Sequence, residues 1–105
     1  MTVLNLTGFL ALSAALLGVG IFGILTRRNF ILLLISVEIG MNAAILNFVY
    51  FAAFPVGASG LSGQAIAVVL IGFAATEVAV GLAIVLALNR LKGTINVAQA
   101  TDLKL

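Results

Sequence analysis

Long uncharged stretches constrain the fold of this chain more than any other feature of its sequence. Residues 1–26 carry no charged side chain. Between Arg28 and Arg90, only Glu38 and Glu77 are charged. Of the 105 residues, 64% are hydrophobic and 8% are charged, against roughly 25% charged residues in an average soluble domain. A soluble fold of this length could not bury so much apolar surface. The sequence therefore predicts an integral membrane protein.

Three apolar runs are long enough to cross a bilayer. A hydrocarbon core of about 30 Å requires about 20 helical residues at about 1.5 Å each. The runs cover residues 4–25, 30–54 and 64–89, and three strands could not close a barrel in their place. The predicted fold is therefore all-α, with three transmembrane helices in one membrane domain over residues 1–105 and a tail at 90–105.

Residues at the ends of the runs support these boundaries. Asn29 is placed to cap the second helix, and Ser62 to cap the third. Pro55 stops the second helix from continuing, and Gly93 follows the basic last turn of the third. The connections are short, so they leave no room for a second domain.

The basic residues predict the orientation of the chain. All five, namely Arg27, Arg28, Arg90, Lys92 and Lys104, fall on one side of the membrane once three spans are drawn. Because cytoplasmic loops collect Lys and Arg, we expect the N-terminus outside and the C-terminus in the cytoplasm. This asymmetry accounts for the net charge of +2, so no nucleic-acid partner is needed to explain it. The first run precedes every basic residue, which favours a retained span over a cleaved signal peptide.

The chain has no cysteine and no histidine. Disulfides, thiolate metal sites, iron–sulfur ligation and the usual haem ligand are therefore excluded, and we expect no metal or cofactor on this chain. The string GVGIFG at residues 18–23 matches the dinucleotide pattern G-x-G-x-x-G, but it lies within an uncharged span and follows no strand. Close helix packing through Gly20 and Gly23 is the better interpretation.

Glu38 and Glu77 are the residues that a membrane span accommodates least readily. A charged side chain at the bilayer centre costs about 2.5–3.5 kcal/mol on insertion scales. No Lys, Arg or His lies in the same spans to neutralise either acid. Glu38 lies about 15 Å beyond Arg28, and Glu77 about 20 Å before Arg90 on a helix of opposite direction. We therefore expect both carboxyls at a similar level near the midplane.

The acids have two interpretations. They could hold helices together through hydrogen bonds, or they could carry protons, because removal from water disfavours the charged form. Asn42, one turn from Glu38, adds a polar neighbour, and Gly81, one turn from Glu77, leaves space for water or a close helix. Adjacent helices lie about 8–10 Å apart, so transfer between the acids requires bridging water or a partner side chain. We favour proton transfer, since no nucleophile, base or metal ligand nearby suggests hydrolysis.

The segments around the two acids resemble one family. RRN before the second span, VEIGMNA around Glu38, and TEVAVGLA around Glu77 with KGT after a basic turn are similar to the K subunit of the proton-pumping NADH:quinone oxidoreductase, respiratory complex I. The similarity covers nearly the whole chain. Each motif alone is weak, and together they are specific.

This resemblance implies a non-redox subunit with no activity alone, in the bacterial inner (plasma) membrane, with the N-terminus outside. It implies that Glu38 and Glu77 belong to the charged groups linking quinone reduction to proton pumping. NADH, FMN, iron–sulfur clusters and quinone would be bound by other subunits. The partners of this chain would be the A, J, N and H subunits and the lipid bilayer.

The resemblance also bears on two arginines and one threonine. Arg27 and Arg28 match the arginines of the family's first loop, where they either pair with acids or lipid headgroups or act only as topology signals. Thr76 departs from the small apolar residue that the family leads us to expect. Its hydroxyl could bond back into its own helix or tune the neighbouring acid.

Two alternative functions stay open. The small subunit of multisubunit cation/proton antiporters shares the plan of three spans, and the paired acids argue against it. A purely structural assembly protein would use its acids only as hydrogen-bonded contacts. Replacement of Glu38 by glutamine separates this second alternative from proton transfer.

Overall fold

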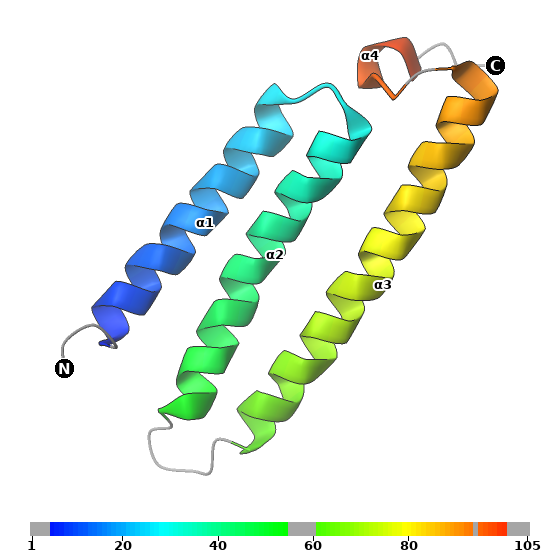
Figure 1. Ribbon diagram of the computed structural model, residues 1–105. Coiled ribbons are helices and arrows are strands. Elements are labelled where there is room, and N and C mark those ends of the chain that lie inside the picture. The colour runs from blue at the N-terminus through cyan, green and yellow to red at the C-terminus, as the bar shows by residue number, and fades with distance from the viewer. Residues whose placement is uncertain (1–4, 55–60, 94, 101–105) are drawn as a thin grey trace.

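The computed structural model describes residues 5–54, 61–93 and 95–100, and three long helices lie side by side in it (Figure 1). The helices are α1 (Leu6–Thr26), α2 (Phe30–Ala53), α3 (Leu61–Lys92) and a short α4 (Val97–Ala100). α2 lies between α1 and α3, and each long helix runs opposite to the one before it (Figure 1). All three are long and apolar enough to cross a membrane. The prediction of an all-α chain with three such helices is confirmed.

Side-chain caps fix the starts of α1 and α2. The Oδ1 atom of Asn29 accepts a hydrogen bond from the backbone N–H of Ile31 at 2.9 Å, as predicted for the cap of α2. Asn5 caps α1 in the same way, which the sequence analysis did not single out. Gly93 follows α3 with φ +66°, a left-handed conformation that glycine adopts without steric cost.

The third helix is longer than the predicted range 64–89. It begins at Leu61, so Ser62 lies inside the first turn, and the prediction that Ser62 caps this helix is wrong. The first turn of α3 contacts α2, where a Cβ on Gly63 would lie 3.0 Å from the Cβ of Ala52. Tertiary packing of this kind stabilises a helix beyond its local signals. The predicted stop at Pro55 lies outside the described residues.

Small residues bring α1 and α2 together. A Cβ added to Gly20 would lie 2.9 Å from both the backbone nitrogen of Gly40 and the carbonyl oxygen of Ser36. A Cβ on Gly23 would overlap the Oγ atom of Ser36 and lie 2.8 Å from its Cβ. The helix backbones therefore touch where no side chain intervenes, as small residues allow in membrane helices. The interpretation of Gly20 and Gly23 as packing residues is confirmed.

We predict that Gly20→Ala weakens the pairing of α1 with α2 by about 1–3 kcal/mol, because a methyl group would meet backbone atoms that cannot move aside. Gly18→Ala is the matched control, since a Cβ there meets nothing within 4 Å. Alanine favours the helix over glycine by about 1 kcal/mol, so a loss in Gly20→Ala would come from the lost contact and not from a lower helix propensity. The measurement is the amount of chain incorporated into membranes and into its native assembly. Equal incorporation of both variants would contradict the close contact.

A short antiparallel contact joins the α1–α2 turn to the segment after α3. The N–H of Phe30 donates to the carbonyl of Ile95 at 2.8 Å, and the N–H of Val97 donates to the carbonyl of Arg28 at 2.6 Å. Asn29 and Asn96 form the bridge between them. This tail clasp, formed by residues 28–30 and 95–97, ties the end of α3 to the start of α2.

We predict that Val97→Pro loosens the tail clasp without disturbing α4. Proline lacks the N–H that bonds to the carbonyl of Arg28. It fits the first position of a helix, and Asn96 before it lies in a β-bridge, which suits a residue that precedes proline. Loss of one hydrogen bond costs about 0.5–1.5 kcal/mol, so exchange of the Phe30 amide hydrogen should accelerate by up to about tenfold. Hydrogen–deuterium exchange measures this rate. Val97→Ala keeps the N–H and should leave it unchanged, and an unchanged rate in the proline variant would contradict the clasp.

Candidate functional site

Contacts between α2 and α3 fix the relative heights of their residues. Near one end of the pair, Gly63 lies against Ala52. Further along, a Cβ on Gly81 would lie 2.7 Å from the Cδ1 atom of Leu34, so the Leu34 side chain fills the space at this glycine. Of the two possibilities predicted for Gly81, space for water or a close helix, the structure shows contact with a side chain of α2. The two contacts define one antiparallel register.

This register places Glu38 and Glu77 at the same height. Glu38 lies four residues, about one turn, beyond Leu34 on α2, and Glu77 lies four residues before Gly81 on α3. Because the helices are antiparallel, both steps lead in the same direction. Each acid is also well inside its helix, away from the ends. The structure thus brings the two carboxyl-bearing residues level, as the sequence predicted from their distances to the arginines.

Glu38 is partly buried, and one of its oxygens is fully enclosed. Its Oε1 atom has no hydrogen-bond partner among the described residues. A buried polar atom without a partner costs about 1–3 kcal/mol. This oxygen of the Glu38 carboxyl is therefore enclosed without a contact that satisfies it within the described part of the chain.

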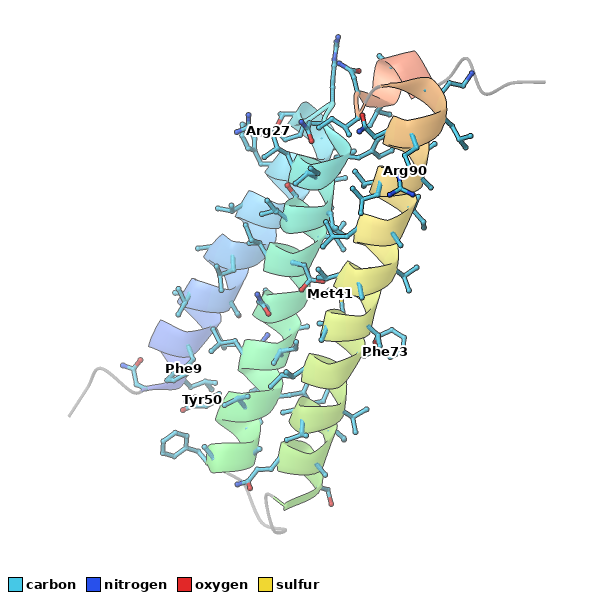
Figure 2. All side chains as sticks on the ribbon, turned by 45° about the vertical axis from the view of Figure 1, so that its right-hand side comes forward. Phe9, Arg27, Met41, Tyr50, Phe73 and Arg90 are labelled. Atoms are coloured by element: carbon cyan, nitrogen blue, oxygen red, sulfur yellow. The ribbon has the colours of Figure 1, made fainter. Side chains whose placement is uncertain are left out.

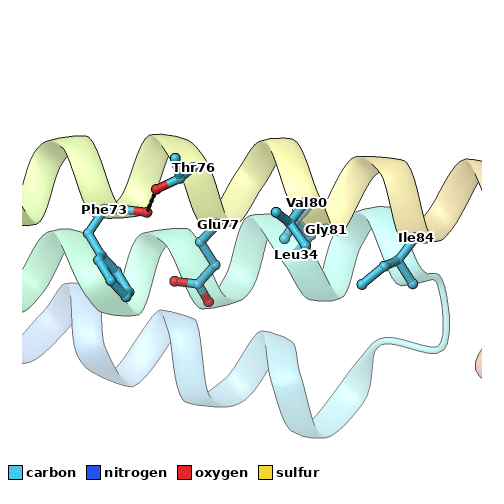
Figure 3. A pocket seen from close by; sticks show the side chains of 7 residues that line it. All are labelled: Leu34, Phe73, Thr76, Glu77, Val80, Gly81 and Ile84. Carbon is cyan, nitrogen blue, oxygen red and sulfur yellow. Dashed lines mark hydrogen bonds between the residues drawn. The ribbon is translucent and has the colours of Figure 1, made fainter.

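Glu77 opens into an apolar pocket of about 430 Å³ at the surface of the chain. The pocket is lined by Leu34, Phe73, Thr76, Glu77, Val80, Gly81 and Ile84. In Figure 3, the Glu77 carboxyl appears between the side chain of Phe73, also on α3, and that of Leu34 on α2. Glu38 does not line this pocket. Leu34, one turn from Glu38 on α2, touches Gly81, one turn from Glu77 on α3, so both acids lie toward the side on which these two helices meet.

Thr76 uses its hydroxyl within its own helix. The Oγ1 atom lies 3.0 Å from the carbonyl oxygen of Gly72 and 2.8 Å from that of Phe73, and the shorter bond is drawn in Figure 3. Of the two possibilities that the sequence left open, the structure shows the bond back into the helix. A hydroxyl has one proton to donate, and a backbone carbonyl accepts it here.

The supporting residues are dispersed. The Asn42 side chain is exposed on the surface of the chain. Arg27 and Arg28 are exposed in the α1–α2 turn, at the same end of the molecule as Arg90 (Figure 2). Arg27 also lines a groove between α1 and α2. These arginines therefore lie at a helix end, far along the axis from Glu38.

Sequence reasoning overlooked Asn47. Its Oδ1 atom is buried and has no hydrogen-bond partner among the described residues. The available signal was a polar side chain in an apolar span, on the same helical face as Ser36, Gly40 and Ala43. Attention to ionisable residues alone missed this amide.

Comparison with known protein families identifies the chain. Residues 8–105 match the family described as NADH-ubiquinone/plastoquinone oxidoreductase chain 4L. The chain belongs to this family, also called subunit K. It is therefore a membrane subunit of NADH-quinone oxidoreductase, complex I, as the resemblance implied.

Individual relatives of subunit K cover most of the chain. NADH-quinone oxidoreductase subunit K of Anaeromyxobacter sp. (strain K) is 48% identical over 89 residues, which is 85% of this chain and 87% of the relative. Subunit K 1 of Syntrophobacter fumaroxidans is 43% identical over 100 residues, covering 95% of this chain and 97% of the relative. NAD(P)H-quinone oxidoreductase subunit 4L of Nostoc sp. (strain PCC 7120) is 42% identical over 101 residues, covering 96% and 99%.

The described residues offer no metal centre. Within residues 5–54, 61–93 and 95–100, no group of three or more His, Cys, Asp or Glu side chains could hold a metal ion. Glu38 and Glu77 are the acidic residues in this part of subunit K.

We predict that Thr76→Val leaves the NADH:quinone oxidoreductase activity of the assembled complex within about twofold of wild type. Valine matches threonine in shape, and the lost hydroxyl donates only to a carbonyl of its own helix. The measurement is NADH oxidation by membranes that contain equal amounts of complex. A loss of activity of tenfold or more would show that the hydroxyl acts on Glu77 instead.

Proposed function

We propose that subunit K carries protons within the membrane arm of complex I through Glu38 and Glu77. The observation that carries this proposal is the equal height of the two acids on adjacent antiparallel helices, fixed by the Leu34–Gly81 and Ala52–Gly63 contacts. Two interacting carboxyls at one level can share or exchange protons as a coupled pair.

The enclosed oxygen of Glu38 argues against a carboxyl that only holds the described helices of this chain together. A carboxyl that serves only to hold helices together needs a hydrogen-bond partner on the helix it holds. The Oε1 atom of Glu38 has none among the described residues. A group that binds and releases protons must instead meet a mobile donor or acceptor, such as water or a side chain of another subunit.

The surroundings of the pair follow from family membership and charge. In our proposal, Arg27, Arg28 and Arg90 lie on the cytoplasmic side, so the N-terminus is outside. The membrane is the bacterial plasma membrane, and the adjacent subunits are A, J and N, with H nearby. NADH, FMN, iron–sulfur clusters and quinone are bound by other subunits, and electrons do not pass through subunit K.

We predict that Glu38→Gln and Glu77→Gln each reduce proton pumping by the assembled complex at least about tenfold. Glutamine preserves size and hydrogen bonding but cannot exchange a proton at neutral pH. If the acids act in series, the double variant should be no worse than the more severe single variant. The measurement is NADH-driven acidification of inverted membrane vesicles, normalised to the amount of complex.

The outcomes separate the alternative functions. Glu38→Asp is the matched control, because it keeps a carboxyl and should retain more pumping than the glutamine variant. Full pumping in an assembled Glu38→Gln complex would rule out an obligatory role in proton transfer. Failure of the glutamine variant to assemble, with normal assembly of the aspartate variant, would favour a structural role for the carboxyl.

A further inference from the structure

Leu34 is the residue through which α2 lines the pocket of Glu77. The other described residues that line this pocket all lie on α3. Figure 3 shows the Leu34 side chain on the side of Glu77 that leads toward the α1–α2 turn. That turn carries Arg27 and Arg28, and Arg90 lies at the same end of the molecule (Figure 2). We call this end of the three helices the arginine end. Leu34 therefore lies at a height between the Glu77 carboxyl and the arginine end.

Both terminal methyl groups of Leu34 lie against Gly81. A Cβ added to Gly81 would be 2.7 Å from the Cδ1 atom of Leu34 and 3.2 Å from its Cδ2 atom. The glycine thus provides the space that the leucine side chain fills. Hydrocarbon closes the contact between α2 and α3 at this height, one turn from Glu77. Narrow spaces lined by hydrocarbon lose their water, and channels use such constrictions as gates.

A side chain, and not backbone, makes this closure. Leucine has more than one staggered rotamer, so its methyl groups can leave Gly81 while the two helices stay in place. The contact at Gly20 differs, because the atoms that a Cβ would meet there belong to the backbone of α2. The position of Leu34 can therefore open and close without separating α2 from α3.

We propose that Leu34 is a hydrophobic gate that controls access of water from the arginine end to the Glu77 carboxyl. The inference rests on the proposed proton transfer by Glu77. With the methyl groups on Gly81, water is kept from the carboxyl. With them displaced, water enters, and a proton passes from water to a carboxylate oxygen or from the carboxylic acid to water. Leu34 takes no part in the proton chemistry, and its closed position prevents protons from leaking back through the acid.

Passive proton flow through the complex tests the gate without any turnover. The complex is reconstituted into liposomes, a pH gradient is imposed in the absence of NADH, and a dye that reports pH inside the liposomes follows its decay. Leu34→Ala removes the carbon atoms that lie on Gly81 and leaves room for water, which needs about 30 Å³ per molecule. We expect the gradient to decay at least about tenfold faster than in wild type, because the apolar groups that exclude water are lost.

Three further variants identify the route of the leak. Leu34→Ala combined with Glu77→Gln should restore the wild-type rate, because the leak passes through the acid. Leu34→Met conserves volume and should stay closed. Leu32→Ala is the matched control, since this leucine is 40% exposed and lines a different groove, beside Arg27.

The outcomes distinguish the gate from the proposed function. A wild-type rate of decay in Leu34→Ala would overturn the gate, and so would a leak that persists after Glu77→Gln. If Leu34→Ala does not assemble, the smaller change Leu34→Val replaces it, with the same expected dependence on Glu77. Full NADH-driven pumping by the single Glu77→Gln variant would instead overturn proton transfer by this acid.

Discussion

Contact between helices through small residues is the interaction on which this structure depends. Gly20 and Gly23 bring α1 onto α2, and Gly63 and Gly81 bring α3 onto the other side of α2. In lipid, association of helices gains little from the hydrophobic effect, so close van der Waals approach must supply it. The buried positions of the described helices are accordingly occupied mostly by small side chains such as Ala43, Ala52, Ala67 and Ala74. These contacts also fix the register of the helices, that is, which residues of neighbouring helices lie at the same level.

The height of the paired acids follows from this packing. Sequence counting placed Glu38 and Glu77 near one level because each lies a similar distance from arginines at the helix ends. That reasoning assumed straight helices of known ends, and α3 proved longer than assumed at both ends. The agreement holds because the contacts at Gly63 and Gly81 fix the register of α3 against α2. Which space each carboxyl faces could not be predicted, because it depends on the rotation of each helix about its axis.

The ends of helices were predictable where they depend on residues close by in the sequence. The Asn29 cap and the Gly93 terminus follow from backbone requirements that any isolated helix would have. Ser62 is not the cap because α3 begins one residue earlier, at Leu61, where Gly63 in the first turn contacts Ala52 of α2. The tail clasp and α4 were not foreseen, since the bonds of Phe30 and Val97 join segments more than sixty residues apart in sequence. Long-range backbone pairing of this kind leaves no periodic pattern in the sequence.

Two enclosed polar oxygens distinguish α2 from the other described helices. The Oε1 atom of Glu38 and the Oδ1 atom of Asn47 are both buried and both lack a partner among the described residues. Leu34, one turn from Glu38, faces α3, whereas Asn47 shares a groove with α1, so the unmet demands lie on different sides of the helix. No described side chain of another helix lies within hydrogen-bond distance of either atom. An enclosed oxygen without a partner costs about 1–3 kcal/mol, so each of these two positions lowers the stability of α2 instead of adding to it.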